Sequence, residues 1–192
     1  MIAVIDYGAG NLYSVTNALD LFGSEYRLAK KPESIAEASA ILLPGVGHFG
    51  QMMEALGRLG MIYPLLDRLT SGVPYMGICL GLHALYESSE EAPGVAGLGL
   101  LPGRVLRFAP GEKVPHMGWS EVQPGGRSYY FAHSYYVPAD AEGSAATAHH
   151  GIDFTAIVRR GNLFGTQFHP EKSGAAGVTL LKEWVNSCLQ SA

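Results

Sequence analysis

The sequence contains little cysteine and little net charge. Only two cysteines, Cys79 and Cys188, occur among 192 residues, and no secretion signal is recognisable, so we expect reduced thiols rather than a disulfide framework. Cys188 lies on the apolar side of a C-terminal helical segment, where we expect it to pack. The 13 Lys and Arg residues are scattered and the formal net charge is −4, which argues against nucleic-acid binding. No apolar run approaches the roughly eighteen residues of a membrane helix, so we expect a cytoplasmic protein.

The remaining composition favours a folded domain. Apolar residues make up 47% of the 192 residues, enough for one domain over residues 1–192 with a sizeable core. Short apolar strands at Ile2–Ile5 and Ala40–Leu43 alternate with helical periodicity at Leu12–Phe22 and from about Ala175 onward. This alternation predicts an α/β fold with a mostly parallel central sheet flanked by helices. Residues 87–103 are acidic, then rich in glycine and without a clear hydrophobic period, so we expect a surface excursion there. From Gly103 to Phe168, short β segments joined by Gly and Pro turns, with a hairpin signal at residues 160–162, predict an antiparallel patch beside that sheet.

In one stretch, VPYMGICLGLHALY at residues 73–86, the spacing of the apolar residues changes at Cys79 from that of a strand to that of a helix. Pro74–Ile78 is a short apolar run suited to a buried strand, and apolar residues then recur at helical spacing. Gly77 and Gly81 flank the change, where a sharp turn leaves no room for a side chain. A strand, a tight turn and a helix that meet at a thiol form a nucleophile elbow, in which the helix N-terminus favours a thiolate. The alternative is a buried, inert cysteine.

A second stretch, NLFGTQFHPEKSG at residues 162–174, holds a histidine and a carboxylate two positions apart. Leu163–Phe168 has the composition of a strand, and on extended backbone His169 and Glu171 would point to the same face. A cysteine hydrolase needs such a pair, because a base must move the thiol proton and an anion must orient the base. The alternative is a histidine at a strand end with a solvated glutamate.

Together these residues resemble a known family. GICLG around Cys79, followed far downstream by His169 and Glu171, resembles the class I glutamine amidotransferases, whose triad is cysteine, histidine and glutamate. The segments VIDYGAGNLYSV, LLPGVGHFG and PHMGWSEV narrow the resemblance to family members that serve as glutaminase subunits of imidazole glycerol phosphate synthase in histidine biosynthesis. The resemblance covers nearly the whole chain. It implies a flavodoxin-like fold and hydrolysis of L-glutamine to glutamate and ammonia through a thioester on Cys79.

The loop Pro44–Gly47 is the candidate for part of an oxyanion hole. Two glycines around Val46 let the backbone rotate freely. An oxyanion hole needs two donors aimed at the carbonyl oxygen, and the amide of Leu80 is the expected first donor. The resemblance implies that the backbone at Val46 and Gly47 supplies the second. An ordinary tight turn is the alternative.

The resemblance also implies how glutamine is held. Glu91 would bind its amino group, and the backbone of Ser134 and Tyr135 would bind its carboxylate. His83 departs from the family, which usually carries glutamine at this position to contact the substrate's side chain, although an imidazole can also donate one hydrogen bond. The alternatives are that Glu91 is solvated and that Tyr135 simply fills the core.

The implied partner is a (βα)8-barrel cyclase subunit. In the family it forms a heterodimer with the glutaminase, receives ammonia through an internal channel, and makes imidazole glycerol phosphate and an aminoimidazole carboxamide ribotide. The glutaminase is almost silent until the cyclase binds its own substrate, so the complex is allosteric. Asn11 and Trp119 fall in segments near that interface. Two other interpretations stay open, a glutaminase of another synthase and a catalytically weak scaffold subunit.

No cofactor and no metal are expected. His149 and His150 are adjacent and would face opposite ways on extended backbone, and no acid or cysteine cluster at ligand spacing accompanies them. Gly8 and Gly10 would need a third glycine at position 13 to form a dinucleotide loop. The chain has Tyr13 there, so an ordinary strand-to-helix turn is expected.

Overall fold

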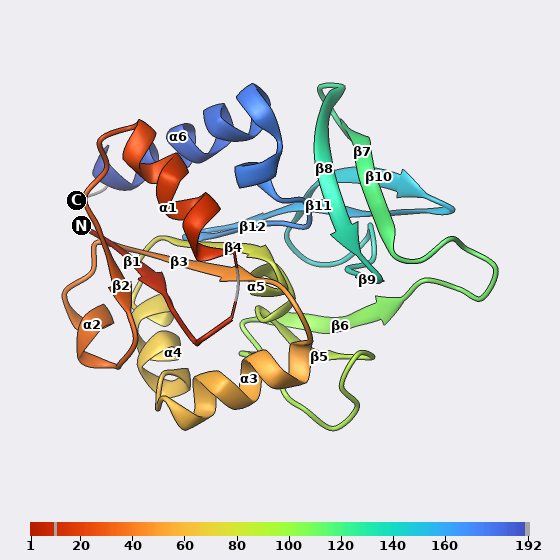
Figure 1. Cartoon of the computed structure of the whole chain (residues 1–192). Coiled ribbons are helices and arrows are strands. Elements are labelled where there is room, and N and C mark those ends of the chain that lie inside the picture. Colours follow the sequence, from red (N-terminus) through yellow and green to blue (C-terminus); the bar gives the residue numbers. More distant parts are fainter. Residues whose placement is uncertain (10, 191–192) are drawn as a thin grey trace.

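The computed structural model describes residues 1–9 and 11–190. Within these residues the main sheet has nine strands (Figure 1). In spatial order they are β2 (Tyr26–Ala29), β1 (Ile2–Ile5), β3 (Ala40–Gly45), β4 (Tyr75–Cys79), β12 (Leu163–Thr166), β11 (Ile152–Arg160), β10 (Ser144–His150), β7 (His116–Gln123) and β8 (Arg127–His133). The strands from β2 to β12 are parallel, and those from β11 to β8 continue the sheet in antiparallel order. The predicted α/β fold with an antiparallel second half is confirmed.

Helices cover both faces of the parallel strands (Figure 1). One face carries α1 (Leu12–Leu21) and α6 (Gly174–Gln190), and the other carries α2 (Glu33–Ala36), α3 (Phe49–Arg58) and α4 (Ile62–Thr70). Successive side chains of a strand point to opposite faces, so Val4 and Leu42 pack beneath α1 and α6, whereas Ile5 and Leu43 pack beneath α3 and α4. Strands buried on both faces are apolar throughout, as these sequences are. None of the helices within the described ranges is long and apolar enough to cross a membrane.

A second, smaller sheet contains β5 (Tyr86–Ser89), β6 (Leu101–Arg107) and β9 (Tyr135–Tyr136). The helical spacing after Cys79 predicts a helix that includes Leu85 and Tyr86, and this prediction is wrong. The helix α5 spans only Leu80–His83, and Tyr86 already pairs with Leu101 of β6. Both Leu85 and Tyr86 are fully buried. Short apolar runs fit either period, and here strand pairing decided the outcome.

Residues 87–103, expected to be a surface excursion, are partly buried. Ser89, Ala92 and Leu98 are all less than a tenth exposed. The backbone N–H of Leu98 donates to the carbonyl of Ala84, which fixes the segment against the end of α5. The segment shows no regular hydrophobic spacing because only isolated side chains anchor it to the core. The prediction of a surface excursion was therefore wrong in part.

The hairpin predicted at residues 160–162 is confirmed. β11 and β12 are joined by Gly161 and Asn162, and Arg160 pairs directly with Leu163. Gly161 has φ +56°, a conformation that glycine adopts without strain. The hairpin turns the chain so that β12 enters the parallel part of the sheet beside β4.

The central position of β4 brings three distant segments together. Cys79 at its end is paired with Gly45 of β3, and Ile78 is paired with Thr166 of β12. The carboxyl ends of parallel strands share one edge of a sheet, which is where α/β proteins form their sites. The loop after β3, the end of β4 and the segment after β12 therefore meet at this edge.

Candidate active site

Cys79 ends β4 in a strained backbone conformation, with φ +54° and ψ −104°. It is the only non-glycine residue with positive φ in the described part of the chain, and such conformations cost about 1–3 kcal/mol. Close packing enforces the turn: a Cβ on Gly81 would lie 2.0 Å from the carbonyl oxygen of Leu43, and one on Gly77 would lie 2.3 Å from the carbonyl of Gly81. The structure thus contains a strand–turn–helix elbow at the thiol.

The helix of this elbow contributes less than predicted. α5 has only four residues, and a helix dipole depends on many aligned peptide units. The dipole of this short helix therefore contributes little at Cys79.

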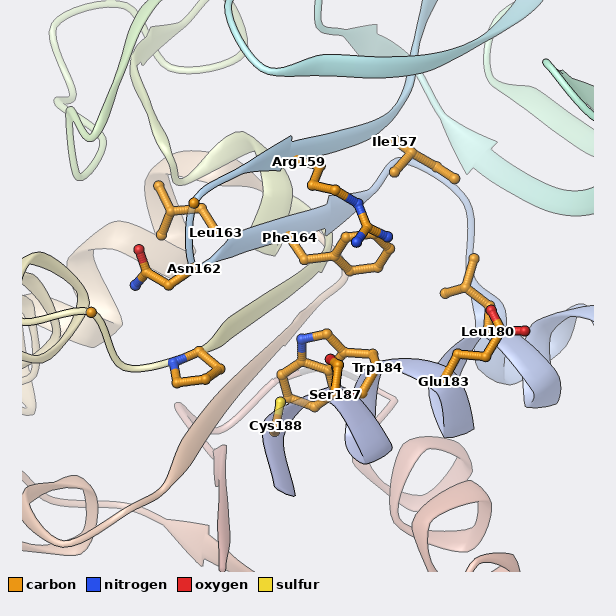
Figure 2. A pocket seen from close by; sticks show the side chains of 13 residues that line it. Ile157, Arg159, Asn162, Leu163, Phe164, Leu180, Glu183, Trp184, Ser187 and Cys188 are labelled. Atoms are coloured by element: carbon orange, nitrogen blue, oxygen red, sulfur yellow. Dashed lines mark hydrogen bonds between the residues drawn. The ribbon is translucent and has the colours of Figure 1, made fainter. Parts of the chain in front are cut away.

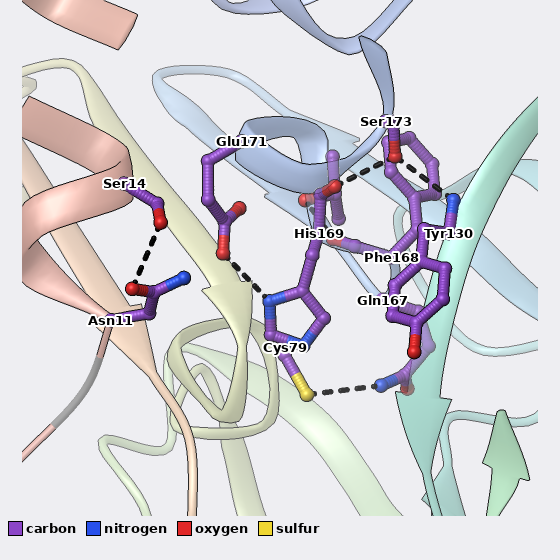
Figure 3. Close-up of polar contacts among 10 residues, drawn as sticks. Asn11, Ser14, Cys79, Tyr130, Gln167, Phe168, His169, Glu171 and Ser173 are labelled. Atoms are coloured by element: carbon purple, nitrogen blue, oxygen red, sulfur yellow. Dashed lines mark hydrogen bonds and ion pairs between the residues drawn. The ribbon is translucent and has the colours of Figure 1, made fainter. Parts of the chain in front are cut away.

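His169 lies beside Cys79, in the segment after β12 (Figure 3). Its Nδ1 donates a hydrogen bond to Oε1 of Glu171 at 2.9 Å, and each side chain is only 2% exposed. The expected pairing is present, but the expected extended backbone is not, because Glu171 lies in a short 3-10 helix, η1 (Pro170–Lys172). Pro170 suits the first position of a helical turn, and the turn folds Glu171 back onto the ring.

The environment of His169 favours its protonated form. Burial alone would lower the pKa of His169, but its contacts with the Cys79 sulfur and the Glu171 carboxylate raise the pKa to about 10. An imidazolium next to a sulfur is the arrangement that activates cysteine nucleophiles. The second carboxylate oxygen of Glu171, Oε2, is buried and accepts no hydrogen bond from the described residues.

Two residues that sequence reasoning missed fix the backbone of His169. The N–H of His169 donates to the carbonyl of Tyr130 at 2.9 Å. The hydroxyl of Ser173 donates to the carbonyl of His169 at 2.7 Å and accepts from the N–H of Tyr130 at 2.9 Å (Figure 3). These bonds tie η1 to β8 and hold the ring in place. No local sequence signal identifies them, because Tyr130 and Ser173 meet only in the folded chain.

Gln167 and His83 form a second polar network around the thiol. Gln167 Nε2 donates to the Cys79 sulfur at 3.8 Å (Figure 3). His83 Nε2 therefore donates to the remaining Gln167 oxygen, Oε1, at 2.8 Å. Burial lowers the pKa of His83 to about 4, although the bond to Gln167 partly opposes this, so the ring is neutral. Its Nδ1 then carries a lone pair, and it is buried without a hydrogen-bond partner among the described residues.

These groups open into one cavity of about 230 Å³. Its lining contains most of the predicted site residues, namely Val46, Gly47, Cys79, Leu80, His83, Glu91, Ser134, Tyr135 and His169. His133 and Lys172 also line it, and sequence reasoning did not select them. Within the cavity Glu91 is already engaged, since its Oε2 accepts from the N–H of Phe49 at the start of α3 at 2.9 Å.

The last residue of β3, Gly45, lies directly against the elbow. A Cβ on Gly45 would lie 2.6 Å from Cβ of Leu80, so only glycine allows this approach. Gly47 has φ +101° and open space around its α-carbon; its requirement for glycine is conformational. Tyr7, another residue missed from sequence, buries its hydroxyl beside the backbone of Val46, and burial raises its pKa to about 12.

Asn11 and Trp119 lie outside this cavity. Asn11 precedes α1 and accepts a hydrogen bond from the hydroxyl of Ser14 at 2.9 Å (Figure 3). Trp119 is 59% exposed on β7, and Met117 of the same strand is 63% exposed. A groove of about 490 Å³ adjoins them, lined by residues 113–120 and His150. We refer to it as the β7 groove.

A larger cavity of about 680 Å³ lies between α6 and the β11–β12 hairpin (Figure 2). Cys188 lines it, but burial raises the pKa of this thiol to about 11, which keeps it protonated at neutral pH. Its described lining residues include no histidine that could act as a base. The sequence pattern predicts an apolar stripe on the last helix, at Val178, Leu181, Trp184, Val185, Cys188 and Leu189. Of these, Leu181, Trp184, Val185 and Cys188 are buried and Val178 is half-buried. Leu189, the last member of that stripe, has its side chain outside the described set.

The described residues contain no group of three His, Cys, Asp or Glu side chains that could hold a metal ion. His149 pairs with Asp153 at 2.7 Å, and Nε2 of His150 donates to the carbonyl of Lys113 at 2.7 Å. The two neighbouring imidazoles therefore take separate partners.

A strained cysteine at the edge of a parallel sheet, with a buried histidine–glutamate pair beside it, has the components of a cysteine-dependent amide hydrolase. Residues 3–187 match the model of the class I glutamine amidotransferase family. The chain belongs to this family.

Several proteins named imidazole glycerol phosphate synthase subunit HisH are similar over nearly their full length. The protein from Moorella thermoacetica is 46% identical, covering 95% of this chain and 93% of that protein. The one from Methanothermobacter thermautotrophicus is 44% identical, covering 96% and 98%. The one from Thermus thermophilus is 46% identical, covering 93% of each.

Solved structures agree on the fold. A crystal structure of a glutamine amidotransferase superposes with a TM-score of 0.80 at 23% identity, over 98% of this chain and 99% of that one. The structure of PurLQS from Thermotoga maritima gives a TM-score of 0.74 at 20% identity, over 98% of each chain.

Proposed function

We propose that this chain is the glutaminase subunit of an imidazole glycerol phosphate synthase. The relatives named HisH are 44–46% identical and cover at least 93% of both chains, which favours this assignment over a glutaminase of another synthase. The observation that carries the chemistry is the buried His169–Glu171 pair beside the strained Cys79. The whole chain, residues 1–192, would act as one cytoplasmic domain and use no cofactor.

The reaction begins with the Cys79 thiolate, which attacks the side-chain carboxamide carbon of L-glutamine. A sulfur–carbon bond forms, and the negative charge moves to the carboxamide oxygen. The N–H of Leu80 and the backbone at Val46 and Gly47 are the proposed donors to this oxyanion. The imidazolium of His169 gives its proton to the departing nitrogen, the carbon–nitrogen bond breaks, and ammonia leaves a glutamyl thioester behind.

Hydrolysis of the thioester uses the same groups in reverse roles. Neutral His169 takes a proton from water, and the resulting hydroxide attacks the thioester carbon. The sulfur–carbon bond then breaks, the new side-chain carboxylic acid gives its proton to solvent as glutamate leaves, and Cys79 returns to the thiolate beside a protonated His169. Glu171 orients the ring and stabilises its positive charge throughout.

Glutamine binding would use the remaining cavity residues. The lone pair on Nδ1 of His83 can accept a hydrogen bond from the carboxamide N–H, a contact that the carboxylate of glutamate does not offer. Glu91 is proposed to bind the α-amino group with the oxygen that does not accept from Phe49. The backbone of Ser134 and Tyr135 is proposed to hold the α-carboxylate.

A partner must receive the ammonia, because in neutral water most of it would become ammonium, which is not nucleophilic. We propose that the partner is a (βα)8-barrel cyclase subunit, that Asn11 and Trp119 lie in or near the contact, and that the complex is a heterodimer with an ammonia channel. The exposed Met117 and Trp119 beside the β7 groove support an interface there, since exposed apolar patches mark interaction sites. Rotation of the loop at Gly47 would switch the oxyanion hole when the cyclase binds its substrate.

The test is glutamate release from glutamine by this protein, alone and with the cyclase subunit and its nucleotide substrate. Strong stimulation that disappears in Cys79→Ala is expected, while synthesis from added ammonia by the Cys79→Ala complex should persist. Steady release that the cyclase does not stimulate would indicate another synthase. Absence of release under all conditions would indicate a scaffold subunit.

A further inference from the structure

Three histidines lie between the β7 groove and the glutamine cavity. His116 and His133 sit opposite each other in the register of β7 and β8, and each is 5% exposed. His116 Nδ1 lies 3.0 Å from His133 Nε2. The ring of His116 also stacks on that of His150, with centroids 4.3 Å apart. The mechanism proposed above uses none of them.

The hydrogen bonds of this cluster have a fixed direction. His133 Nδ1 lies 2.8 Å from the carbonyl oxygen of Tyr135, and a carbonyl can only accept, so this nitrogen carries the proton. Burial lowers the pKa of His133 well below its usual range, so the ring is neutral and its Nε2 accepts. His116 Nδ1 must then donate to it. Burial and the nearby His150 lower the pKa of His116 to about 4, so this ring is neutral too, and its Nε2, 2.8 Å from the hydroxyl of Ser120, accepts from that hydroxyl.

The result is a one-way chain from the hydroxyl of Ser120 through His116 and His133 to the carbonyl of Tyr135. Its outer end lies in the β7 groove, beside the exposed Trp119. Its inner end holds the backbone segment Ser134–Tyr135, which lines the glutamine cavity. The carbonyl of Ser134 is held as well, by the N–H of Phe108 at 3.4 Å.

We propose that His116 and His133 are positioning residues that orient the Ser134–Tyr135 backbone for binding the α-carboxylate of glutamine, with Ser120 fixing the direction of the chain from the β7 groove. This proposal rests on the proposed glutaminase function. A buried polar chain holds one geometry when every member is satisfied. Without the Ser120 hydroxyl, the proton on Nδ1 of His116 can move to Nε2 of the same ring. The lone pairs on Nδ1 of His116 and Nε2 of His133 then face each other and repel. The Ser134–Tyr135 peptides would lose their anchor.

The experiment compares matched pairs of variants in the complex with the cyclase subunit and its nucleotide substrate. His116→Asn and His116→Leu remove the same ring and are nearly equal in size, but only asparagine can donate to His133. Ser120→Ala and Ser120→Thr differ in the hydroxyl and lie at a less buried position, so they decide the outcome if the His116 variants do not fold. The kcat and KM for glutamine are measured for each, and ammonia-dependent synthesis serves as the control for an intact complex.

We expect His116→Leu to raise the KM for glutamine about tenfold over His116→Asn, with kcat changed less than twofold, because binding rather than thioester chemistry is affected. Ser120→Ala should raise KM several-fold over Ser120→Thr. Equal KM values within both pairs, in an active parent complex, would overturn the positioning role alone. Absence of glutamate release by the parent complex would overturn the proposed function, and this assignment with it.

Discussion

Replacing Glu171 with glutamine removes the carboxylate charge beside His169 and keeps an oxygen that can accept from Nδ1. The two side chains are each 2% exposed and joined at 2.9 Å, so solvent screens the charge little. Hydrogen bonds to charged groups contribute about 1.5–3 kcal/mol. If that stabilisation is lost, the thiolate–imidazolium pair forms less readily, and kcat/KM at neutral pH should fall by up to roughly 10- to 150-fold.

The pH profile of Glu171→Gln should move as well. Burial lowers the pKa of His169, and the contacts with Cys79 and Glu171 more than compensate, raising it from 6.5 to about 10. The stabilised imidazolium is therefore fully present below pH 6.5 and is lost as the pH rises through about 10. The parent enzyme should lose activity only near that alkaline limit. Without the carboxylate charge, His169 should lose its proton at lower pH and the alkaline decline should begin earlier.

The assay is glutamate release at several pH values, with the cyclase subunit and its nucleotide substrate present. Glu183→Gln, which removes an exposed carboxylate from α6, is the matched control and should behave as the parent does. A Glu171→Gln enzyme with unchanged kcat/KM and an unchanged alkaline limit would refute the role assigned to this carboxylate.

Two further predictions concern stability. Gly81→Ala should destabilise the fold by about 1–3 kcal/mol or more, because the new Cβ would lie 2.0 Å from the carbonyl oxygen of Leu43. As a control, Gly57→Ala within α3 meets nothing closer than 3.7 Å and should stabilise the fold by roughly 0.5–1 kcal/mol. Equal urea midpoints for the two variants would contradict this prediction. Burial lowers the pKa of His83 to about 4, so on acidification below 6.5 the unfolded chain binds a proton there that the folded chain does not. His83→Gln should therefore reduce the loss of unfolding free energy on acidification by up to about 1.4 kcal/mol per pH unit, and an unchanged slope would contradict a neutral buried ring.

The parts of the site that could be predicted from the sequence are those in which the interacting residues are close together along the chain. Gly77 and Gly81 each lie two positions from Cys79, so the sequence alone predicts the elbow, and their close backbone contacts show why glycine is needed there. His169 and Glu171 are two residues apart, so their pairing was foreseeable even though the backbone between them is a 3-10 turn rather than a strand.

Residues that act across the fold left no such signal. Gln167 reaches the thiol from 88 residues away, and Ser173 reaches Tyr130 from 43 residues away. The strand at Tyr86–Ser89 forms because β6 pairs with it, and apolar spacing alone could not separate it from a helix. Such contacts depend on the order of strands in the sheet, which local patterns do not determine.

Covalent labelling tests most directly whether Cys79 is the nucleophile. The complex would be treated with a glutamine analogue that carries an electrophilic carbon in place of the carboxamide, and its peptides analysed by mass spectrometry. The chain contains one other cysteine, Cys188, whose buried thiol has its pKa raised to about 11 and provides an internal control. A single adduct on the peptide containing Cys79, absent in Cys79→Ala and blocked by excess glutamine, is the predicted result. Labelling of Cys188 instead, or no labelling while glutamine is still hydrolysed, would contradict it.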